Sequence, residues 1–291
     1  MLIMRTLLFV PANRPNMVAR AHQTPADVII LDLEDSVPPA EKAAARNGLR
    51  EAIESLNATG KTVHVRVNHP DTGLTRDDLA AAIGPGLDGL TLPKVDGPRD
   101  IRGVDVMIRE RELHGGVRPG TTVLIAHIES ARGVLRCEEI ATASTRLVGL
   151  ALSGYDYTAD LGVERTREGV ELEYARRVIV HVAAANRLQA LDTVFGDFND
   201  EEGLLAEARY AKAIGFKGKH VIHPVQVEPV NDVFAPHPED VEAARKVIAV
   251  YEEAESRGHA SVQLDGRMID IAVVRRARDV VAFAEAVSAG R

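Results

Sequence analysis

The stretch Val28-Ile29-Ile30-Leu31-Asp32-Leu33-Glu34-Asp35 decides the fold of this chain. A continuous run of Val, Ile and Leu is typical of a strand that is buried on both faces of a parallel sheet. Charges at the C-terminal end of such a strand lie where parallel α/β folds place their active sites. Three more apolar runs end in a charged residue in the same way, at Val63–Arg66, Val123–Glu129 and Leu147–Asp156. The sequence therefore predicts one site assembled from distant segments.

Eight apolar runs recur along the chain, and stretches rich in Ala, Arg, Glu and Leu separate them. Eight alternating β and α units in about 225 residues match a (β/α)8 TIM barrel. A doubly wound sheet is the alternative, but the chain has neither a G-x-G-x-x-G turn nor a P-loop. The predicted strands are Leu7–Val10, Val28–Leu33, Val63–Val67, Gly89–Pro93, Val123–Ile128, Leu147–Leu152, Leu191–Val194 and Val221–Ile222, and the predicted helices between them include Ala40–Leu56, Ile101–Leu113, Glu168–Ala185 and Glu201–Ala213.

The chain continues beyond the point where the barrel would close. A proline-containing stretch leads to two more predicted helices, Glu239–Arg257 and Ile271–Val287. We therefore predict a catalytic barrel domain at residues 1–235 and a C-terminal helical extension at residues 236–291. The extension is predicted as a packed cap, an oligomerisation arm or a lid over the barrel mouth, and composition does not choose among these roles.

Composition excludes several classes of protein. The 291 residues, 45% of them hydrophobic, can bury a full core, and the single Cys137 excludes an internal disulfide framework. A cytoplasmic location is the default expectation. No apolar run approaches the roughly 20 residues that span a bilayer, so we expect a soluble protein without a membrane partner. A net charge of -8 without a basic tract argues against nucleic-acid binding.

Two carboxylates are candidate metal ligands. Glu129 and Asp156 follow neighbouring predicted strands, and adjacent strands lie about 4.8 Å apart, so the two side chains can share one ion. Because both ligands are hard oxygens, the site suits Mg²⁺ or Mn²⁺ better than Zn²⁺. The alternative is a solvated loop acid or a helix N-cap.

The acidic run after the second predicted strand offers further candidates. Alternation along a strand points Asp32 and Glu34 to the barrel interior, where either can hold metal-bound water, and Asp35 to the other face. Asp35 can instead accept hydrogen bonds from backbone amides ahead of the next helix. For each acid, a structural role is the alternative to catalysis.

Basic residues are candidates for binding an anion. Arg66 lies within a predicted strand, and an unpaired guanidinium would be costly to bury. It suits a substrate carboxylate or phosphate, and the alternative is an internal ion pair with one of the acids. Lys94 either neutralises the acidic cluster or extends to solvent. Arg14 suits an extended anionic cofactor tail, with an ordinary surface arginine as the alternative.

Two histidines have the spacing H-x-x-H. His220 and His223 would point to opposite faces of a strand, which makes a zinc pair improbable. His223 is instead predicted to contact substrate at the barrel rim or to be an ordinary core histidine.

Nine motifs occur in collinear order: LLFVPANRP, VIILDLEDSVPPAEKAAAR, VHVRVN, LTLPKV, IESARGV, GYDYTADLG, GDFNDEEGL, VIHPVQV and DGRMID. Together they resemble the citrate lyase beta subunit (CitE-like) branch of the HpcH/HpaI aldolase family. The resemblance covers nearly the whole chain and rests on the set of motifs rather than on any one. It implies a Mg²⁺-dependent TIM barrel that cleaves or forms a carbon-carbon bond between acetyl-CoA, or a related thioester, and a 2-oxo acid.

The resemblance also implies roles for individual residues. Glu129 and Asp156 would bind the metal, and Arg66 would bind the carboxylate of the oxo acid. Glu34 and Asp35 would organise metal-bound water. Arg14 would contact a CoA phosphate, and Lys94 and His223 are assigned to the substrate side by their positions.

Asp270, in the C-terminal G-x-M-I-D motif, would come from a neighbouring subunit, close over the site as part of a lid and move a proton at the acetyl carbon. A homotrimer or a dimer of trimers is therefore implied. The alternative for Asp270 is an acid at the N-terminus of the last helix.

Two positions depart from the family pattern, and both border the expected pocket. Ala12 stands in the first turn where the family usually has Gly, and Tyr155 stands before the metal Asp where an acidic or small residue is common. The expected activity is cleavage of a malyl-, citramalyl- or citryl-CoA thioester. The alternatives are a citrate lyase beta subunit acting on citryl-acyl carrier protein, thioesterase or malate synthase-type chemistry, and a non-enzymatic scaffold.

Overall fold

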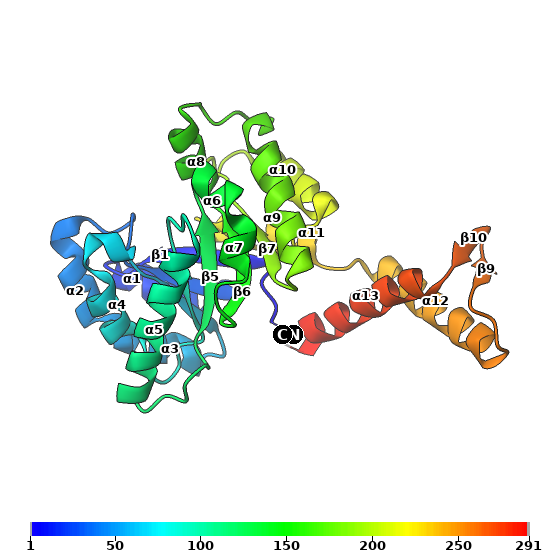
Figure 1. Ribbon diagram of the computed structural model, residues 1–291, viewed down its shortest axis with the longest axis horizontal. Coiled ribbons are helices and arrows are strands. Elements are labelled where there is room, and N and C mark those ends of the chain that lie inside the picture. Colours follow the sequence, from blue (N-terminus) through cyan, green and yellow to red (C-terminus); the bar gives the residue numbers. More distant parts are fainter. Residues whose placement is uncertain (1, 290–291) are drawn as a thin grey trace. The chain divides into compact units, whose positions relative to one another are not determined.

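A computed structural model describes residues 2–289. Within residues 4–234, eight parallel strands pair in chain order and close into a barrel, because the first strand also pairs with the eighth, with Leu7 opposite His220. The prediction of a (β/α)8 barrel is confirmed. The strands are β1 Thr6–Pro11, β2 Val28–Asp32, β3 Thr62–Arg66, β4 Gly89–Leu92, β5 Val123–Ile128, β6 Leu147–Leu152, β7 Gln189–Asp192 and β8 Gly218–Val221 (Figure 1).

Alternation along each strand divides the core into two layers. Ile29, Leu31 and their equivalents on other strands pack outward against the helices. Ile30 pairs with His64, which in turn pairs with Gly89, so this set of residues faces the barrel interior. Since Asp32 and Arg66 are also opposite each other, the same face carries their charges at the carboxyl ends of β2 and β3.

Helices follow the strands around the barrel. Their bounds are α1 Pro15–Ala21, η1 Pro39–Glu41, α2 Lys42–Asn47, α3 Leu49–Ala58, η2 Pro70–Thr72, α4 Thr75–Ala82, α5 Pro98–His114, α6 Ala131–Leu135, α7 Cys137–Ala141, α8 Gly154–Leu161, η3 Val170–Leu172, α9 Glu173–Ala185, α10 Glu201–Ile214, η4 Pro224–Gln226 and α11 Val227–Phe234. The prediction of one helix over Ala40–Leu56 is wrong, because the chain bends at Gly48, a residue with weak helix propensity. The prediction of a helix from Glu168 is wrong at its start, where Gly169 adopts a left-handed conformation.

The last two strands begin earlier than predicted. The strands Leu191–Val194 and Val221–Ile222 were predicted from apolar residues. The observed β7 and β8 include polar residues that a search for apolar runs leaves out. Lys219, in the middle of β8, is fully buried on the outer face of the barrel. Its ammonium donates to Asp192 at 2.8 Å and to Glu207 at 2.5 Å. A lysine can occupy this core strand because two carboxylates neutralise it.

Residues 235–289, together with residues 2 and 3, form a second compact unit. In it, α12 (Pro238–Ser256) and α13 (Ile271–Ala289) pack side by side, and a hairpin of β9 (Val262–Leu264) and β10 (Arg267–Ile269) connects them (Figure 1). Both central residues of the hairpin turn, Asp265 and Gly266, have positive φ, as a type I′ turn requires.

The C-terminal helices after the barrel are as predicted, whereas the exact boundary at 235/236 and the role of a lid stay predictions. Within residues 2–289, no helix combines the length and hydrophobicity needed to cross a bilayer.

Candidate functional site

A cavity of about 270 Å³ opens at the carboxyl ends of the barrel strands. The cavity is lined by residues at or just after the ends of seven of the eight strands. Segments that are distant in the sequence therefore meet here, as predicted. Its lining includes Asp32, Arg66, His127, Tyr155, Asp156 and Thr193.

Arg66 and Asp32 form a buried ion pair at the edge of this cavity. The Arg66 Nε and Nη2 atoms each donate to one Asp32 oxygen at 2.6 Å, and the guanidinium lies 4.5 Å from the centre of the Phe9 ring. Burial alone would raise the pKa of Asp32, but the Arg66 charge and hydrogen bonds hold it below its usual range. Arg66 thus makes the internal ion pair that was the alternative to substrate binding. It still directs Nη1 toward Glu34 Oε2, at 3.3 Å.

The Asp32 carboxylate has a structural role, because hydrogen bonds within the protein occupy both of its oxygens. It accepts the backbone amides of Glu34 at 2.9 Å and Ser36 at 3.1 Å, as well as the Ser36 hydroxyl at 2.5 Å. The amide-capping role considered for Asp35 therefore belongs to Asp32. This arrangement fixes the loop in which Glu34 and Asp35 lie.

Lys94 contacts both remaining acids of the run. Its ammonium donates to Glu34 and lies 3.2 Å from an Asp35 oxygen, so it neutralises the acidic cluster, one of the two outcomes considered. Burial raises the pKa of Glu34 to about 7, with Arg66 and Lys94 opposing the rise and Asp35 adding to it. Lys94 also has a left-handed backbone, with φ 54°, a conformation that is uncommon outside glycine and often found at functional sites.

Glu129 and Asp156 provide the candidate metal ligands. Glu129 follows β5 and is 4% exposed. Its Oε1 atom lies 3.3 Å from Nδ1 of His127, whereas its buried Oε2 atom has no hydrogen-bond partner among the described residues. Asp156, in the first turn of α8, accepts a hydrogen bond of 2.8 Å from the Ser153 hydroxyl.

The electrostatics of Glu129 fit a cation. Burial and the negative charge of Asp156 raise the pKa of Glu129 to about 8, although Arg66 opposes the rise. A buried carboxylate oxygen without a donor, close to a second carboxylate, suits a hard divalent ion. Within residues 2–289, no group of three or more His, Cys, Asp or Glu side chains converges to hold a metal. Two carboxylates with water and substrate oxygens are the coordination that Mg²⁺ commonly takes.

Three further predicted site residues belong to other segments of the chain. Arg14 is exposed just before α1, at the end of the β1 turn. His223 is exposed after β8, and its ring stacks on Phe198 with 4.8 Å between ring centres. Asp270 lies in the C-terminal unit, where its Oδ1 atom accepts the amides of Ala272 and Val273. The catalytic and binding roles of all three stay predictions.

A set of interior histidines was not predicted as part of the site. His64, His127 and His220 are buried inside the barrel, and the rings of His127 and His220 lie 4.8 Å apart. Burial lowers the pKa of His64 to about 3, and the nearby His220 adds to this shift. Burial also lowers the pKa of His127 to about 3, and the positive charge of Arg66 adds to that shift. Strand alternation was a usable signal, because His127 lies two residues before Glu129 and His64 two before Arg66.

A closed barrel with carboxylates and an arginine at the carboxyl ends of its strands is the architecture of a barrel enzyme. The chain belongs to the HpcH/HpaI aldolase/citrate lyase family, whose model matches residues 5–224. It is an oxo-acid lyase of the citrate lyase beta and malyl-CoA lyase branch, which confirms the resemblance seen in the motifs.

Three relatives illustrate the match. The chain is 42% identical to citrate lyase subunit beta of Leuconostoc mesenteroides subsp. cremoris, over 97% of this chain and 93% of that protein. It is 37% identical to L-malyl-CoA/beta-methylmalyl-CoA lyase of Cereibacter sphaeroides, over 98% and 96%. Among solved structures, CitE from Mycobacterium tuberculosis in complex with magnesium, acetoacetate and coenzyme A matches with a TM-score of 0.77 and 31% identity, over 97% and 98%.

Proposed function

We propose that this protein uses Mg²⁺, or Mn²⁺ in its place, to cleave a 3-hydroxy-acyl-CoA thioester of the malyl, citramalyl or citryl type into acetyl-CoA and a 2-oxo acid. The observation that carries the proposal is the buried, unpartnered Oε2 atom of Glu129 next to Asp156. Support comes from the two lyases among the relatives and from the magnesium, acetoacetate and coenzyme A bound to the structural relative.

In this proposal Glu129 and Asp156 hold the metal ion, which supplies Lewis-acid stabilisation of negative charge on the substrate oxygens. Arg66 uses two N–H groups on Asp32 and offers Nη1 to the carboxylate of the oxo acid. Arg14 contacts a CoA phosphate, and His223 and Lys94 border the substrate.

Two acids are assigned to proton transfer. With a pKa of about 7, Glu34 is suited to accept the proton of the substrate's 3-hydroxyl group through a water that Asp35 helps to orient. The bond between C2 and C3 then breaks, leaving the 2-oxo acid and the enolate of the thioester. Asp270 donates a proton to C2 of that enolate, which completes acetyl-CoA.

We propose a homotrimer or a dimer of trimers in which Asp270 acts on the barrel of a neighbouring subunit. Three apolar side chains near Asp270, those of Met268, Ile271 and Val273, are exposed in the C-terminal unit. Exposed apolar side chains near a polar group are a common feature of surfaces that bind another subunit.

The direct test incubates the purified protein with malyl-CoA, citramalyl-CoA or citryl-CoA, in Mg²⁺ or in EDTA, and follows products by mass spectrometry. We expect Mg²⁺-dependent release of acetyl-CoA and the matching oxo acid from at least one thioester. Free CoA without acetyl-CoA would identify a thioesterase and contradict the proposal.

A second candidate follows from the 42% identity to a citrate lyase beta subunit, which favours a substrate carried on an acyl carrier protein. Cleavage of citryl-acyl carrier protein, with no cleavage of the three CoA thioesters, would establish this alternative.

A further inference from the structure

The walls of the cavity differ in chemistry. Asp32 and Arg66, from β2 and β3, contribute charge to its lining. The segments that end or follow β1, β6, β7 and β8 contribute most of its apolar side chains, which we call the apolar wall, together with the polar Ser153, Thr193 and His220. The apolar wall consists of Met17, Leu152, Tyr155, Val194 and Ile222. Since Tyr155 immediately precedes Asp156, this wall borders the proposed metal ligand.

Tyr155 is a fixed part of the apolar wall although it is 47% exposed. The Arg165 guanidinium lies 5.7 Å from the centre of the tyrosine ring. Arg165 is itself held by Glu171 at 2.7 Å and by Glu207 at 3.0 Å. The tyrosine hydroxyl also packs closely against Gly196, where a side chain would collide with it unless the tyrosine shifted. These contacts position the ring at the edge of the cavity.

The lining carries little positive charge. Within the described barrel, Arg66 is the one Lys or Arg side chain among the residues that line the cavity, and it is paired with Asp32 and Glu34. A substrate with one carboxylate on its oxo-acid half can use Arg66 and the metal ion. Lys94, proposed to border the substrate, already neutralises Glu34 and Asp35. A second carboxylate, as in a citryl group, would therefore be desolvated against the apolar wall without a free cation of its own, which is unfavourable.

We infer that Tyr155 is a specificity-determining residue, and that it restricts the enzyme to thioesters whose oxo-acid half carries one carboxylate and a hydrogen or a methyl group. Malyl- and citramalyl-type substrates are therefore preferred over citryl-type ones. The inference rests on the proposed lyase function and selects among its substrates.

The kinetic test compares kcat/KM for the three CoA thioesters. In the natural protein, we expect the better of malyl-CoA and citramalyl-CoA to exceed citryl-CoA by about 100-fold, a discrimination that pocket contacts can supply. Tyr155→Phe keeps the wall and should keep this ratio. Tyr155→Ala opens the wall to water, which can solvate the second carboxylate, and should shift the ratio about tenfold toward citryl-CoA.

A matched control is Tyr174→Ala, which removes an exposed tyrosine outside the cavity lining and should leave all three constants within about twofold. Citryl-CoA as the best substrate of the natural protein would overturn the inference. An unchanged ratio in a folded Tyr155→Ala protein would overturn it as well.

Binding provides a readout that needs no turnover. Calorimetry of the natural protein in Mg²⁺ should show tighter binding of pyruvate or glyoxylate than of freshly dissolved oxaloacetate, by about tenfold or more. Equal binding, or binding of none of the three, contradicts the inference. If the oxo acids bind in the expected order while no thioester is cleaved, the proposed function fails and the selectivity of the cavity stands. If citryl-CoA is cleaved best, the function stands and the selectivity fails.

Discussion

At the scale of single residues, Glu129 lies where a carboxylate is poorly stabilised unless a cation is present. Its Oε2 atom is buried without a described donor, and burial together with Asp156 raises its pKa to about 8. The folded protein therefore holds this proton more tightly than the unfolded chain does. The resulting stabilisation is complete below the ordinary pKa of about 4.5 and is lost as the pH rises to about 8.

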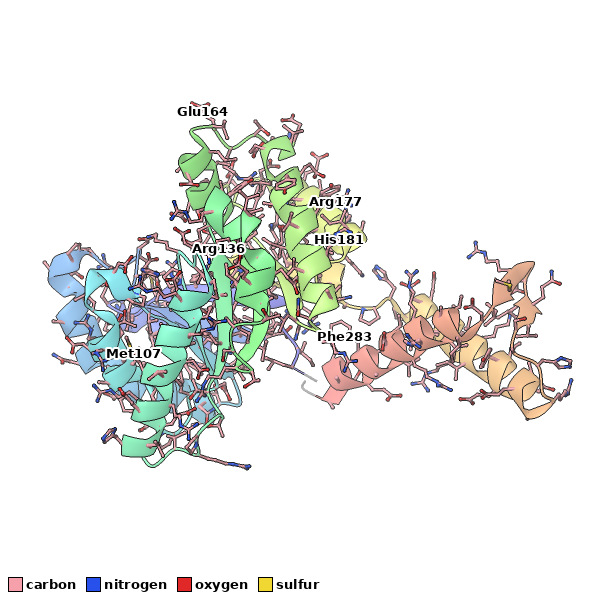
Figure 2. All side chains as sticks on the ribbon, in the orientation of Figure 1. Met107, Arg136, Glu164, Arg177, His181 and Phe283 are labelled. Carbon is pink, nitrogen blue, oxygen red and sulfur yellow. The ribbon has the colours of Figure 1, made fainter. Side chains whose placement is uncertain are left out.

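Replacing Glu129 with Gln should separate metal binding from stability. We expect Mg²⁺ affinity to fall by at least about tenfold, because one of two charged ligands is lost. In EDTA, the natural protein should lose about 1 kcal/mol of unfolding free energy per pH unit between pH 5 and 8 relative to Glu129→Gln. Calorimetry and urea denaturation measure the two effects. The exposed Glu164, marked in Figure 2, gives the control Glu164→Gln, which should change neither.

A second prediction at this scale concerns Arg66. Arg66→Met leaves Asp32 charged and buried, so the unfolding free energy should fall by about 3–5 kcal/mol. The double variant Asp32→Asn/Arg66→Met removes the uncompensated charge and should recover at least half of the loss, a result that urea denaturation can test. No recovery would mean that the ion pair is not what stabilises this region. The exposed Arg177 of Figure 2 supplies a control, since Arg177→Met should cost less than about 0.5 kcal/mol.

At the scale of the elements, strand alternation places polar groups on the inner face of the barrel. His64 in β3 is buried there, and burial lowers its pKa to about 3. The unfolded chain therefore binds a proton that the folded protein excludes. The stability associated with neutral His64 is complete above the ordinary pKa of about 6.5 and is lost as the pH falls toward 3.

His64→Gln should make the barrel less sensitive to acid. Between pH 6 and 4, we expect the natural protein to lose about 1 kcal/mol more unfolding free energy per pH unit than the variant. Guanidinium denaturation at several pH values checks this difference. His181, on the exposed surface of α9 one turn after Arg177 (Figure 2), gives the control His181→Gln, which should follow the natural protein. Parallel pH profiles for the natural protein and His64→Gln would contradict the prediction.

The strands that sequence could predict best are those with unbroken apolar runs, such as β1 and β2. In β8 the run is interrupted by Lys219 and His220, whose burial depends on partners from β7 and α10. The bend at Gly48 also escaped prediction, because the helical composition continues on both sides of it. Local patterns therefore predicted the order of the elements better than their ends.

For the site, sequence predicted which residues follow the strands but not how they pair. For Arg66 the sequence left open a substrate anion or an internal ion pair with one of the acids, and only the register of β2 against β3 shows that Asp32 lies opposite it. The contact of Tyr155 with Gly196 joins two different loops, so no local pattern contains it. Ion pairs and contacts between segments need the assembled barrel.

At the scale of the whole molecule, the proposed sharing of sites between subunits predicts complementation. Glu129→Gln and Asp270→Asn should each be nearly inactive alone. When the two variants are co-expressed with different tags and mixed oligomers are purified, about a third of the sites in a trimer, or about a quarter in a dimer of trimers, pair a natural barrel with a natural Asp270 from another chain. Acetyl-CoA release at about a third of the natural rate is expected for the trimer, and at about a quarter for the dimer of trimers. No recovery in a mixed oligomer would show that each chain uses its own Asp270.

The buried charges behind β7 and β8 have a consequence for how the barrel opens. Lys219 is the partner of both Asp192 and Glu207, and Arg176 also binds Asp192 at 3.0 Å. If β8 alone separated from the barrel, Asp192 and Glu207 would keep Arg176 and Arg165 but would lose the buried ammonium that contacts both of them. Local separation of β8 from β1 and β7 is therefore less favourable than unfolding of the whole barrel. The last barrel strand to be synthesised thus makes the unfolding of the other seven barrel strands cooperative with its own.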